Sequence, residues 1–308
     1  MNILIELPTW LGDAVMTTPS IENIMSYYND SKITLLGSLV ATEVVKSHPK
    51  INRAYALEYK YRNLYKTAKK LGDFDLFLSY RGSMRARCMK FFVSANMKYQ
   101  YDKNKYNDGH QVEKYNNFVN DCLGINTNPG KLIVHNQNKS MDSNKKLLGL
   151  NPGASYGSAK RWYPEEFANL AFNLSTDYDV IIFGGADEID IASDIEKYLI
   201  EKGVSNYKNL AGQTSIKELI NQIANLDLFI TGDSGPMHVA AALQIPTISI
   251  FGPTNDRTTS QWANEKSVII KKKLECQPCL KRKCPLHHHN CMKKIKAIEV
   301  LDSVRLIV

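Results

Sequence analysis

The stretch FITGDSGPMH, residues 229–238, joins an apolar strand to an apolar helix predicted at Val239–Leu243. Backbone N–H groups are unpaired at the start of a helix, and the helix dipole places roughly half a positive charge there. The small and polar residues Asp233, Ser234 and Gly235 at this junction would let an anion approach the backbone closely. The stretch therefore predicts an α/β fold with a seat for a diphosphate, and we expect the chain to bind a phosphorylated donor.

Strand and helix patterns alternate on both sides of this stretch. In the first half the pattern predicts strands at Ile3–Leu7, Ile33–Gly37 and Phe74–Ser79 and helices near Pro19–Tyr28 and Ala41–His48. After a polar stretch at Asn126–Lys145 it restarts, with strands at Leu147–Asn151, Val180–Gly184, Leu228–Thr231 and Thr247–Phe251 and helices at Pro164–Leu174 and Ser215–Ala224. This order predicts two doubly wound units with parallel sheets, joined near residue 140, with ligands in the cleft between them.

Length and composition are those of an ordinary globular protein. The chain has 308 residues, of which 44% are hydrophobic and 23% charged, and this length allows roughly two domains. No apolar run reaches the roughly 18 residues that a membrane span needs, and the first residues do not resemble a secretory leader. We therefore expect the protein in the cytoplasm.

The formal net charge of +8 is distributed unevenly. Residues 1–145 contain 20 Lys and Arg against 13 Asp and Glu, and nine of these basic residues lie between residues 60 and 90, where only Asp73 and Asp75 oppose them. An anionic surface or substrate is one partner that such a stretch predicts. A solvated basic face without a partner is the alternative.

The motif PTWLGDA, residues 8–14, directly follows the first predicted strand. Gly12 permits a sharp turn, and Asp13 would then lie in a loop or a first helical turn and point into the cleft, where a carboxylate can take a proton from an incoming hydroxyl. Asp is also a favoured residue at helix starts, so a purely structural role for Asp13 is the alternative.

Two further motifs follow predicted strands of the second half. NPGASYGSAKRW, residues 151–162, is rich in hydrogen-bond donors, and its Lys160 suits phosphate oxygens and a leaving group that gains negative charge. FGGADE, residues 183–188, ends in acids that could hold ribose hydroxyls. An ordinary loop and a helix start with favourable acids are the respective alternatives.

The residues around Ser234 could also suggest a serine hydrolase, and the role of His238 has two alternatives. The sequence Gly232-Asp233-Ser234-Gly235 lacks the second glycine of a serine-hydrolase elbow, because residue 236 is Pro. His238 lies about one turn inside the predicted helix, so it could contact a phosphate or be buried in the core.

Four cysteines cluster near the C-terminus, at positions 276, 279, 284 and 291, with three histidines among them. Such a set is compatible with tetrahedral zinc, although the spacing matches none of the common zinc fingers. A packed, reduced cysteine-rich loop is an equal alternative. Nine basic residues lie between residues 271 and 296 against a single acid, so this loop is a second candidate for contact with an anion.

Taken together and in this order, the motifs resemble those of the ADP-heptose:lipopolysaccharide heptosyltransferases, glycosyltransferase family 9. The resemblance spans essentially the whole chain and is closest to the heptosyltransferase II branch. It depends on residues 8–13, 152–162 and 233–242 and on the Cys-Pro…Cys loop. It implies a GT-B fold: an acceptor-binding Rossmann-like domain at 1–140, an ADP-sugar-binding one at 146–290, and a C-terminal helix at 291–308 that returns to the first domain.

The resemblance also implies an activity and a set of site residues. The activity is inverting transfer of L-glycero-D-manno-heptose from ADP-heptose to the heptosyl-Kdo2-lipid A inner core of lipopolysaccharide. Asp13 would be the general base, and Lys160 would hold the diphosphate. Ser155, the backbone N–H groups of Ser234 and Gly235, and His238 would join Lys160 on the diphosphate. Glu188 or Asp187 would hold the ribose, Thr214 would lie beside the adenine, and Asp233 is a further donor-binding candidate.

Acceptor phosphates and carboxylates would be bound by Arg81 and Arg85 in the basic stretch. We expect neither a metal nor another cofactor, because Lys160 and the helix start can neutralise the diphosphate. The partners implied are the donor, the lipid-anchored acceptor and, by peripheral contact, the anionic inner face of the cytoplasmic membrane, with no nucleic acid.

Other functions remain open at this point. Heptosyltransferase I, or another surface-glycan transferase of the family, would keep the chemistry and change the acceptor. A metal- or nucleic-acid-binding module would depend on the cysteine loop and the basic charge, but the basic stretch has no groove-reading motif. A nicotinamide-dependent dehydrogenase is disfavoured because no Gly-x-Gly-x-x-Gly follows a predicted strand.

Overall fold

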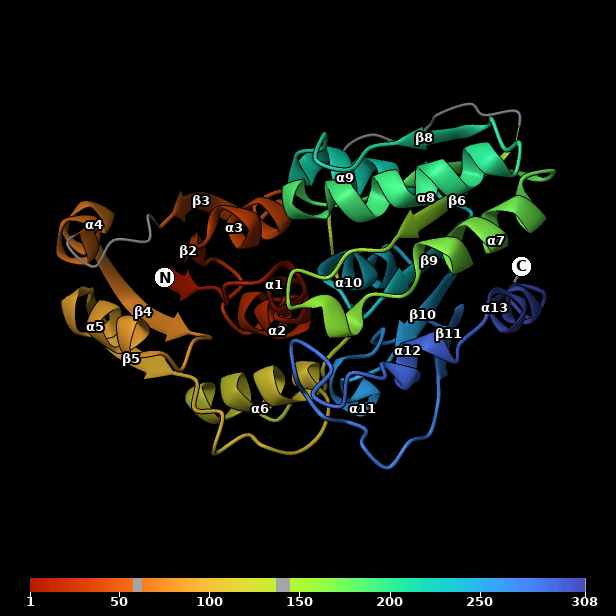
Figure 1. Cartoon of the computed structure of the whole chain (residues 1–308). Helices are drawn as coiled ribbons and strands as arrows, with labels where there is room; N and C mark the ends of the chain where they lie inside the picture. The colour runs from red at the N-terminus through yellow and green to blue at the C-terminus, as the bar shows by residue number, and fades with distance from the viewer. Residues whose placement is uncertain (58–62, 137–144, 308) are drawn as a thin grey trace. The chain divides into compact units, whose positions relative to one another are not determined.

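The computed structural model describes residues 1–57, 63–136 and 145–307, and the chain divides into two compact units, Met1–His135 and Asn136–Val308 (Figure 1). The boundary lies close to the expected one near residue 140. Residue 140 itself lies outside the described residues, as do Lys60 and Arg62 of the basic stretch.

The first unit is a five-stranded parallel sheet with helices between its strands, and the strand order is β3-β2-β1-β4-β5. Its elements are β1 (Asn2–Glu6), α1 (Leu11–Met16), α2 (Thr18–Tyr27), β2 (Lys32–Gly37), α3 (Leu39–Val45), β3 (Ile51–Ala56), α4 (Leu64–Leu71), β4 (Asp73–Ser79), α5 (Met84–Phe92), β5 (Ser94–Gln100) and α6 (Gln111–Leu123).

The second unit is a six-stranded parallel sheet of order β11-β10-β9-β6-β7-β8. Its elements are β6 (Lys146–Asn151), the short 3-10 helix η2 (Ser158–Lys160), α7 (Pro164–Leu174), β7 (Tyr178–Ile182), η3 (Ala186–Glu188), α8 (Ile189–Glu201), β8 (Tyr207–Asn209), α9 (Ile216–Ala224), β9 (Leu228–Gly232), α10 (Gly235–Ala242), β10 (Thr247–Phe251), α11 (Asp256–Thr259), β11 (Ser267–Lys271), α12 (Asn290–Lys293) and α13 (Ala297–Val304).

Both sheets have the strand order of a doubly wound nucleotide-binding fold, so the prediction of two Rossmann-like units is confirmed. In each unit the order reverses between two central strands, β1 and β4 in the first and β6 and β9 in the second. Ligands of such sheets bind beyond the carboxyl ends of the strands at this reversal. The motifs at residues 8–14 and 151–162 directly follow β1 and β6, and residues 233–235 directly follow β9.

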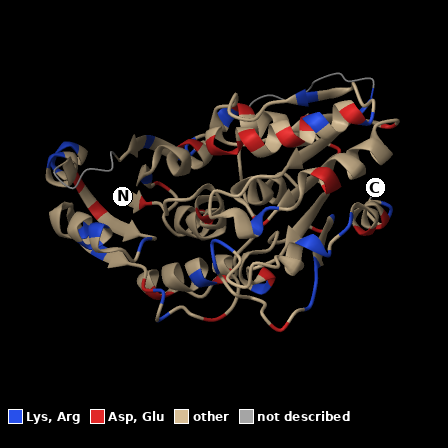
Figure 2. Ribbon diagram, viewed as in Figure 1, with Lys and Arg blue, Asp and Glu red and all other residues tan. Residues whose placement is uncertain are grey.

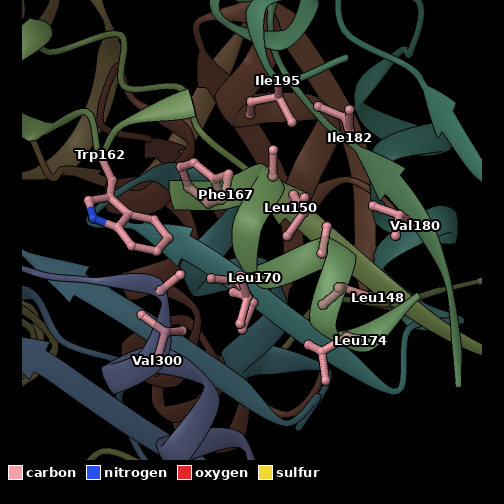
Figure 3. Close-up of a cluster of buried hydrophobic side chains, with 14 of the residues drawn as sticks. Leu148, Leu150, Trp162, Phe167, Leu170, Leu174, Val180, Ile182, Ile195 and Val300 are labelled. Atoms are coloured by element: carbon pink, nitrogen blue, oxygen red, sulfur yellow. The ribbon is translucent and has the colours of Figure 1, made fainter. Parts of the chain in front are cut away.

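The central strands are apolar and buried on both faces, as expected for a parallel sheet that helices cover. In the second unit, Leu148 and Leu150 of β6 pack with Phe167 and Leu170 of α7 and with Trp162 (Figure 3). The Trp162 indole is 2% exposed, and its N–H donates to the Ile295 carbonyl at 3.0 Å. Burial of these side chains holds the loop at 151–162 against a fixed core.

The C-terminal helix packs within the second unit. A buried stripe of α13, formed by Ala297, Val300 and Val304, belongs to the core of the second unit, where Figure 3 shows Val300. Helix α13 packs against α7 and β10. Lys296 Nζ and the Ala297 N–H also contact the Glu166 carboxylate on α7, at 2.6 and 2.8 Å. The final segment is therefore part of the core of the second unit.

One helix begins earlier than the pattern predicted. Helix α10 starts at Gly235 rather than Val239, with Pro236 in its first turn, where the missing N–H of proline costs nothing. Asp13 lies in the first turn of α1, one of the two placements that the sequence predicted. In the part of the chain that the structure describes, no helix combines the length and apolar character that crossing a bilayer requires.

Candidate active site

Asp13 lies in the first turn of α1, the helix that follows β1. It is half-buried and lies two residues after α1 begins, where the helix N-terminus favours a negative charge. Burial raises the pKa of both Tyr101 and Tyr115, and the Asp13 carboxylate is close enough to raise both pKa values further. Gln111 donates to the Tyr101 hydroxyl at 3.3 Å. Asp13 therefore lies near two tyrosines, Tyr101 and Tyr115, which the sequence alone did not indicate.

The two arginines proposed to bind the acceptor lie around a buried carboxylate, Glu6, the last residue of β1. Arg81 Nη1 is 3.8 Å from Glu6 Oε1, and the Ser79 hydroxyl donates to Glu6 Oε2 at 2.6 Å. Arg85, on the first turn of α5, is 8% exposed, and its positive charge also acts on Glu6. Two cations therefore surround one carboxylate, which leaves a net positive charge at the carboxyl edge of this sheet.

Burial raises the pKa of Glu6 above its usual value, despite the opposing effects of Ser79 and the two arginines. The folded protein binds the Glu6 proton more tightly than the unfolded chain does. The resulting stabilisation of the fold is fully present at pH values below the unfolded-state pKa, near 4.5, and is lost as the pH rises through the folded-state pKa. We therefore expect Glu6→Gln to raise the thermal midpoint at pH 8 and to leave it unchanged at pH 4. Thermal unfolding at both pH values measures this.

The matched control is Glu43→Gln, on α3 of the same unit, where the carboxylate is partly exposed and pairs with Lys46 at 2.5 Å. It should not raise the midpoint at either pH. A Glu6→Gln protein that is less stable than wild type at pH 8 would mean that the two arginines outweigh the burial of the carboxylate.

In the second unit, a set of polar side chains joins the carboxyl ends of β6 and β9. Asn151 Nδ2 donates to the hydroxyls of Thr231 and Ser234, both at 3.1 Å, and these two hydroxyls are 3.0 Å apart. Ser234 is the N-cap residue of α10 but makes no side-chain capping bond. The first N–H groups of α10, including that of Gly235, are therefore presented at the strand-order reversal, where an anion can bind them.

Lys160 is brought to the same place by η2. Its Nζ lies 2.6 Å from Asp233 Oδ2 and 3.2 Å from the Asp233 carbonyl oxygen, and both side chains are largely buried. Asp233 therefore orients the lysine.

Ser155 is exposed on the same loop as Lys160. His238 is 2% exposed within α10, which favours a place in the core over direct contact with a phosphate.

The two candidate ribose-binding acids have different environments. Asp187 is exposed, whereas Glu188 is 7% exposed and its carboxylate accepts from the Gly185 N–H at 2.8 Å. A Cβ at Gly153 would lie 2.1 Å from the Glu188 carboxyl carbon, so this carboxylate rests on the loop that follows β6. The geometry therefore favours Glu188 of the two.

Thr214 follows a turn that is joined to the Glu188 loop by a hydrogen bond from the Gly212 N–H to the Gly184 carbonyl, at 2.9 Å.

The cysteine loop packs on the loop that carries Lys160. His289 Nε2 is 2.9 Å from the Ala159 carbonyl, and its Nδ1 is 3.1 Å from the Tyr163 hydroxyl. The four clustered cysteines, all free thiols, line one small cavity of about 20 Å³ together with Ala159, His288 and His289. Within the described ranges 1–57, 63–136 and 145–307, no three His, Cys, Asp or Glu side chains are grouped so that they could hold a metal ion.

Comparison with known proteins assigns the family. A model described as glycosyltransferase family 9 (heptosyltransferase) matches residues 64–290. The chain belongs to this family. The resemblance predicted from the motifs is therefore confirmed, and the protein is a glycosyltransferase.

This family 9 transferase has relatives of similar length. It is 40% identical to the lipooligosaccharide heptosyltransferase 2 of Campylobacter jejuni serotype O:2, over 99% of this chain and 98% of the relative. It is 25% identical to the lipopolysaccharide heptosyltransferase 2 of Escherichia coli K12, over 87% and 88% of the two chains.

Solved structures share the fold of the transferase. The structure of E. coli ADP-heptose LPS heptosyltransferase II superposes with a TM-score of 0.83, at 23% identity, over 100% of this chain and 98% of that one. E. coli heptosyltransferase WaaC with ADP gives a TM-score of 0.79 at 14% identity, with both chains fully covered. These neighbours confirm the predicted GT-B fold class.

Proposed function

We propose that this transferase is a heptosyltransferase II, which moves L-glycero-D-manno-heptose from ADP-heptose to the heptosylated Kdo2-lipid A inner core with inversion at the anomeric carbon. The observation that carries the proposal is the 40% identity, over nearly the full length of both chains, to a relative named lipooligosaccharide heptosyltransferase 2. The relative named lipopolysaccharide heptosyltransferase 1, from Campylobacter coli, is only 23% identical over 87% of this chain.

On the donor side, the proposal assigns the diphosphate to Lys160, Ser155 and the N–H groups of Ser234 and Gly235. As the bond to the sugar breaks, negative charge develops on ADP, and preorganised donors and cations stabilise it. The 2.6 Å pair with Asp233 supports this role because it holds the Lys160 ammonium at the N-terminus of α10. Glu188 is assigned to the ribose hydroxyls and the backbone near Thr214 to the adenine.

On the acceptor side, Asp13 is assigned the role of general base. Inverting transfer needs one base on the acceptor hydroxyl while the anomeric carbon carries partial positive charge. The position of Asp13 at the strand-order reversal of its unit supports this role. Arg81 and Arg85 are assigned to the phosphates and carboxylates of the inner core, because guanidinium groups bind such anions in a bidentate manner.

The proposed setting is the cytoplasmic face of the inner membrane, in peripheral contact with its anionic surface. The lipid anchor of the proposed acceptor requires such a place, and the basic residues of the first unit support it. The proposed reaction involves neither a cofactor nor nucleic acid.

Transfer assays with two purified acceptors, Kdo2-lipid A and its mono-heptosylated form, test this proposal with ADP-heptose as the donor. Heptosyltransferase II activity predicts product only with the heptosylated acceptor. Product with the plain acceptor would identify heptosyltransferase I instead. Unused ADP-heptose with both acceptors would contradict the proposed donor or the proposed acceptor class.

A further inference from the structure

Helices α4 and α5 of the first unit present a continuous aromatic surface, which we call the α4–α5 face. Phe91 is 80% exposed, an unusual value for a phenylalanine on a helix. Its ring centre is 5.5 Å from that of Phe92, which is in turn 5.5 Å from that of Tyr65 on the other helix. Met84, which is 64% exposed, lies seven residues before Phe91 and so on the same side of α5.

This face is not needed to hold the unit together. The opposite sides of the two helices supply Leu64, Ala68, Leu71 and Met89 to the core beneath the sheet. The exposed rings are therefore additional apolar surface, and contiguous surface of this kind marks a site of interaction with a partner or a membrane.

The charge of the α4–α5 face is of one sign. The sequences LYKTAKKL and MRARCMKFF of the two helices contain six basic residues and no acid (Figure 2). Lys66, Lys69, Lys70 and Arg87 are exposed, and Lys69 Nζ lies 4.9 Å from the centre of the Tyr65 ring. Protein surfaces that lie at the boundary between lipid headgroups and acyl chains typically combine exposed aromatic rings with surrounding cations.

We propose that the α4–α5 face docks on an anionic phospholipid bilayer, with Phe91 and Phe92 inserted at the headgroup level and the lysines on lipid phosphates. The proposal gives a location to the membrane contact of the proposed function, on which it rests. Arg85, at the start of α5, lies on the buried side of the same helix whose exposed side carries Phe91. Docking of α5 would therefore hold the proposed acceptor-binding edge of the unit near the lipid surface.

Sedimentation with vesicles tests the proposal. The wild-type protein should bind vesicles that contain phosphatidylglycerol and not vesicles of phosphatidylcholine alone, and binding should fall as salt screens the charges. Phe91→Ser should weaken binding by at least about 10-fold, since it removes buried apolar area at the interface. A triple Lys66→Ala, Lys69→Ala, Lys70→Ala variant should also lose binding.

The matched control is Ile200→Ser, where the side chain is 62% exposed on α8 of the second unit, a helix that contains four acidic residues and one lysine. It should bind like wild type. Three results would each overturn the proposal: equal vesicle binding by Phe91→Ser and wild type, equal binding to both vesicle types, or a Phe91-dependent dimer without vesicle binding.

Transfer to a deacylated, soluble acceptor should be unchanged in Phe91→Ser. If neither the wild type nor Phe91→Ser transferred sugar to the soluble acceptor, the proposed function would be contradicted, and the vesicle-binding result would still stand.

An independent observation concerns Arg282 in the cysteine loop. Its guanidinium carbon lies 5.2 Å from the centre of the Tyr156 ring, and Lys160 Nζ lies 5.0 Å from the same centre. The two cations are therefore no more than about 10 Å apart. The Arg282 carbonyl accepts from the Ala159 N–H at 3.1 Å, and the Tyr156 hydroxyl donates to the Leu280 carbonyl at 2.8 Å.

The close approach of the two loops requires glycine at position 157. A Cβ there would lie 2.4 Å from the Arg282 carbonyl oxygen. Arg282 is thus held beside the loop that carries Lys160 by its backbone and by its side chain.

Charge is the reason to assign Arg282 a function. Lys160 and Asp233 form a pair of zero net charge, which cannot by itself neutralise a diphosphate. Arg282 is exposed and forms no ion pair with an acid in the part of the chain that the structure describes. We infer that Arg282 binds a phosphate of the donor beside Lys160, an inference that depends on the proposed donor site.

Calorimetric titration with ADP measures this contribution without requiring turnover. Arg282→Ala should weaken ADP binding by about 10-fold, and Arg282→Lys should recover part of the loss. Lys283→Ala, which removes the adjacent exposed cation, is the matched control and should bind ADP like wild type. Equal affinity in Arg282→Ala and wild type would overturn the inference alone, whereas a wild-type protein that does not bind ADP would contradict the proposed donor.

Discussion

The Asp13→Asn protein is expected to transfer the sugar at least about 100-fold more slowly than wild type, with ADP binding unchanged. Asparagine has almost the shape of aspartate but cannot accept a proton from the attacking hydroxyl. Because Asp13 lies in the first unit and the proposed donor-binding residues lie in the second, loss of its carboxylate should lower kcat without changing the affinity for the donor. Steady-state transfer kinetics and ADP calorimetry measure the two quantities separately.

A spectroscopic signal checks that the substitution acts where the structure places Asp13. The negative charge of Asp13 raises the pKa of Tyr101 and Tyr115, so removing it should lower the pH at which these tyrosines ionise in an ultraviolet titration. Asp102→Asn is the matched control: Asp102 also raises the pKa of Tyr101 but is exposed, and its loss should leave turnover intact. Near-normal turnover in Asp13→Asn would remove this residue from the role of base.

Lys160→Ala is expected to lower kcat/KM by at least about 100-fold, through both weaker donor binding and slower transfer. Two effects add in the same direction. The diphosphate loses its cation, and Asp233, whose side chain is only 7% exposed, is left as an unpaired carboxylate near the developing negative charge. ADP affinity and transfer rates measure the loss.

The second effect can be isolated with a double mutant. Asp233→Asn in the Lys160→Ala background should restore part of the ADP affinity, because it removes the repulsion, whereas Asp233→Asn alone should weaken binding by releasing the lysine. Lys197→Ala, in an exposed pair with Asp194 at 3.0 Å, is the matched control and should behave like wild type. Unchanged kinetics in Lys160→Ala would refute the phosphate role.

Much of the secondary structure was predictable because it depends on local periodicity. Strand β10 (Thr247–Phe251) and helix α7 (Pro164–Leu174) have the bounds that the pattern predicted. Edge strand β3 and helices α4 and α5 were not predicted. Their residues are mixed polar and apolar, and only packing against the sheet shows which side is buried.

The candidate site was predictable only in part. Lys160 and Glu188 stand in motifs that follow strands, and local pattern was enough to mark both as candidates. The association of Glu6 with two arginines was not predicted, although a single acid in the apolar run of residues 1–7 is a signal of a buried charge with partners. The contact between Arg282 and Tyr156 has no local signal, since it joins residues 126 positions apart.

By itself, the sequence determined the family, the alternation of strands and helices, and the motifs at the carboxyl ends of strands, because each of these is a property of short contiguous segments. Tertiary structure alone decided the order of the strands, which sets β1 beside β4 and β6 beside β9 and so gathers Glu6 with Arg81 and the loop of Lys160 with Asp233. It also decided that α13 packs in the second unit and that the aromatic side of α5 is exposed. The physical reason is that burial and charge pairing depend on residues far apart in the chain, which no local pattern specifies.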